Sequence, residues 1–200
     1  MELEVLKRMI KNTIQSSKND LAKKIEIMSI VTEALKSIDV KPIIVGGQAV
    51  EFYTSGGYAT MDIDILCERS ISKIDSVLSP LGFEKEIKYW VLDEGDMDIA
   101  IEVPSGPLAG DWDKVTEVKT KQGLSAYFIG VEDIIVDRLN RFKHWKEYSD
   151  KEWIIGMIIL HYKKIDWKYI YKRAEEEKTL EEIKKIRKKA ENNMEEIENQ

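Results

Sequence analysis

The chain has 200 residues, of which 31 are basic and 37 acidic, so its formal net charge is −6. This length suits one α/β core with helical extensions, and the acidic balance argues against a protein that binds nucleic acid over its whole surface, while a local basic patch stays open. The single cysteine, Cys67, excludes an intrachain disulfide and a zinc site built from cysteines.

The hydropathy of the chain predicts the cellular location of the protein. The first residues contain no apolar signal core, and no stretch approaches the roughly 18–20 apolar residues that span a bilayer. We therefore expect a cytoplasmic protein without a membrane partner. Cys67 follows Ile63-Asp64-Ile65-Leu66, which favours a small buried residue at a strand end over a reactive thiol.

Two helices are predicted at the N-terminal end, over residues 2–16 and 21–37. Apolar residues in the second helix recur every three or four positions and so form one face: Leu21, Ile25, Met28, Val31 and Leu35. Asn19 or Asp20 can cap its start. We treat residues 1–37 as an N-terminal helical region.

The central region, residues 38–130, is expected to fold as an α/β core. Runs of β-branched or alternating residues predict strands at 42–45, 61–66, 115–119 and 126–129. A β-hairpin is predicted next. Its two arms are expected at 86–92 and 97–103, with the turn at 93–96. Short helices are expected at 48–53 and 71–78.

The C-terminal region, residues 131–200, is expected to be helical, with helices at 131–145, 150–163, 166–177 and 180–198. Thr179 and Glu182 fit a capping box at the start of the last helix. Its narrow apolar stripe predicts packing on its own domain; a homo-oligomer or partner contact is the alternative, and an RNA-contacting patch ranks third.

The histidines and tryptophans of this region are interpreted mainly as structural. His144 is expected to be a helix-surface or packing residue, although with Arg141 it could line a nucleotide cleft, and His161 lies in an apolar helix. Neither has a second histidine at the spacing of a metal site. The tryptophans fit a core better than a base-stacking platform: Trp145, Trp153 and Trp167.

Asp62 and Asp64 carry the strongest chemical signal in the sequence. They lie two apart on a predicted strand, so both carboxylates project from one face. Adjacent carboxylates repel each other where water is scarce, and a divalent cation removes that repulsion. Hard oxygen ligands of this kind suit Mg²⁺. An exposed acidic sheet face without a metal is the alternative, because Asp-x-Asp is a short and common pattern.

Two further elements add to this signal. Gly46-Gly47 follows a β-branched strand and opens a helix, where a phosphate could approach the backbone N–H groups; a plain strand-to-helix turn is the alternative. On the second hairpin arm, Asp98 and Glu102 share a face, and either could join the two aspartates if the strands are neighbours. The alternative for each is a solvated charge at a sheet edge.

Together these elements resemble the nucleotidyltransferase superfamily. Its pattern is a glycine pair, a short helix, two aspartates separated by one apolar residue, and an acidic residue on a later strand. The matching segments are Val45-Gly46-Gly47-Gln48-Ala49, Thr60-Met61-Asp62-Ile63-Asp64-Ile65 and Ile101-Glu102-Val103-Pro104. The wider context, over roughly residues 40–155, is similar to small prokaryotic members related to AbiEii-type toxin or antitoxin proteins.

The resemblance implies an α/β (α+β) fold with a mixed sheet, and transfer of a nucleoside monophosphate from a nucleoside triphosphate to a hydroxyl of RNA, a protein or a small molecule. Asp62, Asp64 and a third carboxylate would hold Mg²⁺ or Mn²⁺ ions. Glu102 fits the third motif best and Asp98 is the fallback. Arg138 and Arg141 would neutralise triphosphate charge, although relatives commonly have Lys where this chain has Arg138.

Two other classes of function remain open from the sequence. The fold could serve as a binding module without turnover, such as an antitoxin or a regulatory partner, or as a nucleotide sensor. Two metal-binding aspartates would serve any of the three classes.

Overall fold

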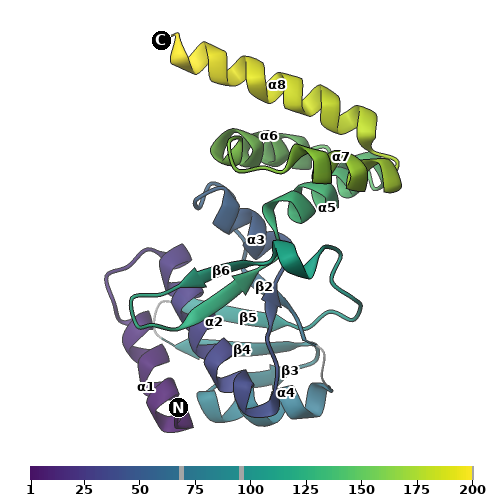
Figure 1. Cartoon of the computed structure of the whole chain (residues 1–200). Coiled ribbons are helices and arrows are strands. Elements are labelled where there is room, and N and C mark those ends of the chain that lie inside the picture. Colours follow the sequence, from purple (N-terminus) through teal and green to yellow (C-terminus); the bar gives the residue numbers. More distant parts are fainter. Residues whose placement is uncertain (68–69, 95–96, 200) are drawn as a thin grey trace. The chain divides into compact units, whose positions relative to one another are not determined.

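The computed structural model describes residues 1–67, 70–94 and 97–199 (Figure 1). Within these residues the chain forms a seven-stranded mixed sheet with the strand order β3-β4-β5-β2-β1-β7-β6. The strands are β1 (Ile43–Ile44), β2 (Asp62–Leu66), β3 (Glu84–Glu86), β4 (Tyr89–Glu94), β5 (Met97–Glu102), β6 (Thr116–Lys119) and β7 (Ser125–Phe128). The α/β fold class expected from the sequence is therefore confirmed.

Two parallel pairings set the centre of this sheet. β2 pairs in parallel with β5, and β1 pairs in parallel with β7, whereas the remaining neighbours are antiparallel. Strand β1 has only two residues because the backbone enters a left-handed conformation at Gly46, where φ is +61°. The sheet thus brings together segments that are distant in the chain, such as Asp62 with Ala100 and Ile44 with Phe128.

Helices from the N-terminal half bury one side of this core. They are α1 (Leu3–Ile14), α2 (Asp20–Leu35) and α4 (Ile71–Leu78). Helix α2 packs against β7, and both α1 and α4 pack against α2. Asn19 caps α2, since its side chain accepts a hydrogen bond of 2.9 Å from Ala22 N. Both predicted N-terminal helices are confirmed, with slightly shorter bounds.

The predicted hairpin contains one more strand than expected. Ile87 takes a left-handed φ of +49°, which an extended strand cannot accommodate. The expected first arm is therefore divided into β3 and β4, and with β5 it forms a three-stranded meander. Asp93 and Glu94 of the predicted turn belong to β4, while 95–96 lie outside the described residues.

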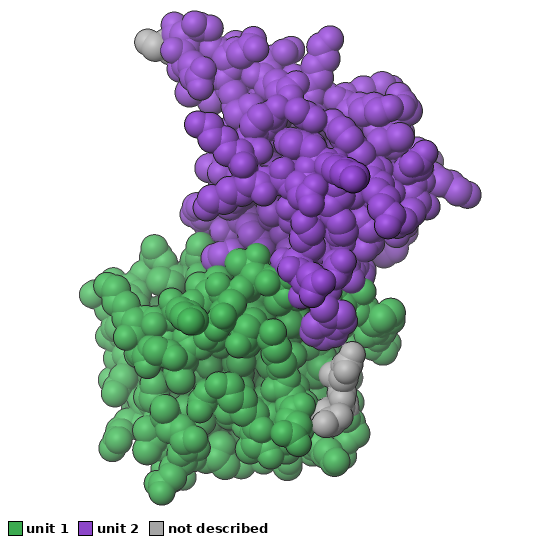
Figure 2. Space-filling model, viewed as in Figure 1, with its two compact units in different colours: residues 1–49, 59–108, 115–129 green, residues 50–58, 109–114, 130–200 purple. Residues whose placement is uncertain are grey.

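The chain divides into two compact units, shown in different colours in Figure 2. Unit 1 contains residues 1–49, 59–108 and 115–129, and unit 2 contains residues 50–58, 109–114 and 130–200. The boundary falls within α3 (Gly46–Tyr53), which begins at the first glycine rather than after the pair. Whether the regions 1–37, 38–130 and 131–200 behave as separate domains stays a prediction.

Unit 2 is built from the four predicted C-terminal helices: α5 (Val131–His144), α6 (Asp150–His161), α7 (Trp167–Glu176) and α8 (Leu180–Glu198). Helix α8 packs on α6 and α7 and buries Ile183, Ile186 and Ala190. This confirms that the apolar stripe packs on its own domain. The capping box is wrong, because Thr179 caps no N–H group and its hydroxyl donates to Ala174 O instead.

Side chains of unit 2 bear on three further expectations. His144 lies at the surface with a ring nitrogen 3.3 Å from Glu177 O, and a ring nitrogen of His161 lies 2.8 Å from Tyr53 O. Both histidines are therefore structural, as expected. Trp145 contradicts its expectation: it is 74% exposed, because it follows the last residue of α5 and its ring does not reach the core.

Short 3₁₀ helices complete the described structure, at Lys36–Ile38, Ser79–Leu81 and Trp112–Lys114. Cys67 follows β2 and is partly buried, and burial raises the pKa of its thiol to about 12. This agrees with the interpretation of Cys67 as a packing residue, since the reactive thiolate is scarce at neutral pH. Among the described residues, no helix combines the length and the apolar character needed to cross a bilayer.

Candidate active site

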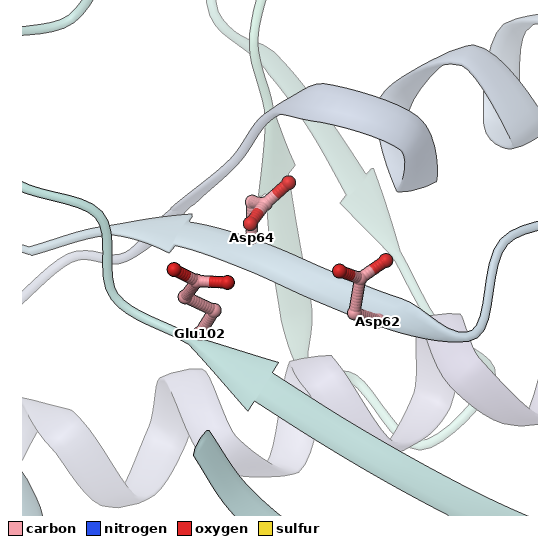
Figure 3. Close-up of side chains that lie close together, drawn as sticks. All are labelled: Asp62, Asp64 and Glu102. Carbon is pink, nitrogen blue, oxygen red and sulfur yellow. The ribbon is translucent and has the colours of Figure 1, made fainter. Parts of the chain in front are cut away.

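Three carboxylates meet on neighbouring strands of unit 1 (Figure 3). On β2, Asp62 and Asp64 alternate with Ile63 and Ile65, which are fully buried in the core. The parallel register places Asp64 opposite Glu102 of β5. One carboxylate oxygen from each of the three acids lies within 4.8 Å of the others. We call Asp62, Asp64 and Glu102 the acidic triad.

Gly46 allows the backbone to approach this triad closely. A Cβ atom at this position would lie 2.3 Å from Asp64 Oδ2, a distance that no side chain tolerates. Val45, just before the glycine, donates its N–H to Asp64 O at 2.9 Å. The left-handed φ of Gly46 and the missing side chain together bring the start of α3 against the carboxylate of Asp64.

Replacing Gly46 by alanine is expected to damage the site by two separate effects. The left-handed backbone costs an alanine about 1–2 kcal/mol, and the added Cβ would displace the Asp64 carboxylate. We expect Gly46→Ala to lower the free energy of unfolding and to remove the stabilisation of the protein by Mg²⁺. Chemical denaturation and thermal shift measurements check the two effects.

Gly123 provides a matched control for this substitution. Its φ of +78° is also left-handed, but no atom lies within 4 Å of its Cβ position. Gly123→Ala should therefore show the backbone cost alone, with the Mg²⁺ response intact. If the two variants had equal unfolding free energies and equal metal responses, the close approach at Asp64 would be irrelevant.

Thr60 and Lys24 support the triad from the side of Asp62. Thr60 Oγ1 donates a hydrogen bond of 2.9 Å to Asp62 Oδ1, and Lys24 Nζ donates one of 2.7 Å to Thr60 O. A pocket of about 220 Å³ lies beside them, lined by Asp20, Lys24, Thr60, Met61, Met97 and Asp98. Sequence reasoning missed Lys24, since only tertiary packing joins α2 to the strand. Thr60, in contrast, lies only two positions before Asp62, so the sequence itself offered it as a neighbour of that carboxylate.

Glu102 is paired with a lysine that the sequence analysis did not identify. Lys88 Nζ donates hydrogen bonds of 2.9 and 2.8 Å to the two carboxylate oxygens of Glu102. This pairing with Glu102 raises the pKa of Lys88. Lys88 precedes Tyr89, which pairs with Glu102 across β4 and β5. The ammonium group thus offsets part of the negative charge of the triad.

The triad fits a divalent cation by its chemistry. All its donor atoms are hard carboxylate oxygens, which suit Mg²⁺ or Mn²⁺. Three negative charges within a few ångström are costly without a cation, and Lys88 neutralises only one of them. The side chain of Lys88 is itself largely exposed, whereas that of Glu102 is partly buried.

Asp98 lies apart from the triad. It is exposed on β5, opposite Asp93 of β4, and it lines the pocket beside Thr60. It lies two positions before Ala100, which pairs with Asp62. Of the two alternatives for the third carboxylate, the register therefore brings Glu102 to the aspartates.

The two arginines proposed for triphosphate binding lie on α5 in unit 2. Arg138 is 2% exposed, and its guanidinium lies 3.7 Å from Asp150 and 3.6 Å from Asp137. Arg141 is partly exposed, with Nε 3.0 Å from Asp150 Oδ2. These contacts favour an internal ion pair for Arg138 and leave Arg141 with one exposed side.

Gln48 is a candidate residue that the sequence analysis treated only as part of a helix. It lies in the first turn of α3, is 1% exposed, and has no hydrogen-bond partner for its side-chain amide among the described residues. A buried amide without a partner is costly unless a ligand or an ordered water satisfies it. Its place two residues after Gly46 makes it a candidate ligand contact.

A mixed sheet with paired aspartates, a third acid on the parallel neighbour and a glycine at the start of a helix defines a protein of the nucleotidyltransferase class. The chain belongs to the family described as "Nucleotidyltransferase of unknown function (DUF6036)", whose sequence profile matches residues 19–200. No curated protein matches the chain significantly.

A solved structure shares the fold. A nucleotidyltransferase-like antigenic protein from Paracoccidioides brasiliensis is 20% identical, with a TM-score of 0.52, and the match covers 70% of this chain and 76% of that one. A candidate nucleotidyltransferase from H. pylori is 14% identical, with a TM-score of 0.47 and coverage of 80% and 77%. The closer relation to AbiEii-type proteins stays a prediction.

A third similar structure is that of ANT(2″)-Ia in complex with adenylyl-2″-tobramycin. It is 14% identical, with a TM-score of 0.41, and the match covers 71% of this chain and 99% of that one.

Proposed function

We propose that the protein transfers a nucleoside monophosphate from a nucleoside triphosphate to a hydroxyl group, with Mg²⁺ or Mn²⁺ held by the acidic triad. The observation that carries this proposal is the convergence of three carboxylate oxygens within 4.8 Å, beside the glycine at the start of α3. Membership of a nucleotidyltransferase family supports it independently.

Each residue of the site has a role in this proposal. Asp62 and Asp64 bind the metal, and Thr60 orients Asp62 through its hydrogen bond to Oδ1. Glu102 shares the metal or accepts the proton of the acceptor hydroxyl. The bound divalent ions would stabilise the charge that develops on the attacking and leaving oxygens. The backbone at Gly46 leaves space for a phosphate to approach α3.

The arginines are assigned less directly. Arg141 keeps one exposed side and could neutralise triphosphate charge. Arg138 is buried beside Asp150, so its main role is proposed to be structural and triphosphate binding is assigned to it only second. The acceptor is proposed to be RNA, a protein or a small molecule. Incubation of the protein with labelled nucleoside triphosphates and Mg²⁺ tests the proposal, with label transfer to one of these acceptors as the expected result.

A metal titration gives a second prediction that needs no acceptor. Mg²⁺ or Mn²⁺ should raise the melting temperature, and a nucleoside triphosphate should raise it further, because ligands that bind only the folded state stabilise it. The double variant Asp62→Asn with Asp64→Asn should lose both shifts. If the variant responded to metal as the native protein does, the metal site would lie elsewhere.

The ion pair between Lys88 and Glu102 favours a second candidate function. If Lys88 remained on Glu102 when nucleotide is bound, the third carboxylate would serve neither the metal nor the acceptor. The protein would then be a binding module or nucleotide sensor without turnover, for example an antitoxin or regulatory partner. Metal and nucleotide shifts without label transfer to any acceptor would support this second function.

A further inference from the structure

The connection between α5 and α6 exposes two aromatic rings on unit 2. Trp145 is 74% exposed and Tyr148 is 67% exposed. The Tyr148 ring packs edge-on against Phe142, with 6.1 Å between the ring centroids. We call residues 145–148 the aromatic turn. Tryptophan and tyrosine rings are enriched at interfaces, so two exposed rings three positions apart make this turn a candidate contact surface.

The backbone fixes this turn at the end of α5. Trp145 and Glu147 both donate their N–H groups to Arg141 O, at 3.1 and 3.2 Å. Between them Lys146 takes a left-handed φ of +60°, a conformation that is strained for a lysine and common in glycine. The backbone of the turn is therefore held in one conformation, and the Tyr148 ring is held against Phe142.

The charge around the turn is opposite to that of the whole chain. Residues 141–151 contain four basic and two acidic side chains, in a chain whose net charge is −6. One of the two acids, Asp150, is buried against Arg141 and does not face the solvent. Lys146 is exposed and has no ion-pair partner in the part of the chain that the structure describes. The other acid, Glu147, is exposed, and Lys143 is paired with Glu182, so the cations closest in sequence to the rings are Lys146 and the partly exposed Arg141.

We infer that the aromatic turn binds single-stranded nucleic acid by stacking bases on Trp145 and Tyr148 beside the cationic groups of Arg141 and Lys146. Exposed aromatic faces next to basic side chains are the combination that binds unpaired bases with little sequence preference. A protein partner fits less well, since charged residues separate the rings and no continuous apolar centre forms. This inference is independent of the triad in unit 1.

Fluorescence anisotropy of labelled oligonucleotides tests the inference without nucleotide or metal. We expect the full-length protein to bind 12-nucleotide single strands of RNA and DNA more tightly than duplexes of the same sequence. Raising KCl from 50 to 200 mM should weaken the binding, because phosphate contacts release counterions. The RNA and DNA single strands show whether the sugar contributes to recognition.

Variants of the turn make the test specific. Trp145→Ala and Tyr148→Ala should each weaken single-strand binding at least fivefold, and Trp145→Phe should retain most of it. Trp112→Ala is the matched control, because Trp112 is 51% exposed in the same unit but lies between Asp111 and Asp113. Circular dichroism and melting temperature show that each variant is folded.

Three results would overturn the inference. The first is no single-strand binding by the native protein at 50 mM KCl, and the second is equal binding by native protein and folded Trp145→Ala. The third is a change of oligomeric state in Trp145→Ala, measured by light scattering, which would make the turn a protein interface. The variant Asp62→Asn with Asp64→Asn should bind as the native protein does, so a failed transferase would leave this inference intact.

Discussion

Glu102→Gln is expected to lower the turnover number of nucleotidyl transfer by about 100- to 10,000-fold, the usual contribution of a positioned base. Nucleotide affinity should change far less, since a base acts mainly in the transition state. Asp98→Asn, on the same strand but outside the triad, should stay within about twofold of the native rate. Steady-state kinetics with a working acceptor would check both variants.

The partner of Glu102 requires its own control. Glu102→Gln also removes the ion pair with Lys88, so a lost ion pair could be mistaken for a lost base. Lys88→Met breaks the same pair and keeps the carboxylate, and it should retain activity. A large loss in Lys88→Met, or in Asp98→Asn with Glu102→Gln unaffected, would contradict the assignment of Glu102.

Arg138→Met should lower the free energy of unfolding by about 3–5 kcal/mol, the typical cost of breaking a buried ion pair from one side. The substitution removes the buried one of the two guanidinium groups beside Asp150 and leaves only the partly exposed Arg141, at 3.0 Å, as its partner inside unit 2. Burial already raises the pKa of Asp150, and the guanidinium groups of Arg138 and Arg141 oppose that effect. Urea denaturation, followed by both tryptophan fluorescence and circular dichroism, measures the change.

The double variant Arg138→Met with Asp150→Leu decides the role of Arg138. Replacing both partners by apolar residues removes the stranded charge, so most of the lost stability should return. If Arg138 is structural, nucleotide affinity in the double variant should equal that of the native protein. Restored stability with strongly weakened nucleotide binding would show instead that Arg138 contacts the triphosphate.

Local sequence patterns determined most of the secondary structure and the core of the site. The alternation of Asp62 and Asp64 with buried isoleucines is a period of two, which depends only on strand geometry. All four helices of the C-terminal region were expected to within two residues at each end, and apolar positions recurring every three or four residues predicted the helix at 21–37. Such features arise from neighbours in the chain, so they can be recognised before any tertiary structure is known.

Other features depended on pairing between distant segments. The choice between Glu102 and Asp98 follows from the parallel register of β2 and β5, in which Asp64 pairs with Glu102. Contacts between segments distant in the chain determine that register. Lys88 approaches Glu102 only because a left-handed Ile87 divides one predicted strand into two. The exposure of Trp145 follows from where α5 ends. Sequence periodicity carries none of this information, because register, strand breaks and exposure are set by long-range packing.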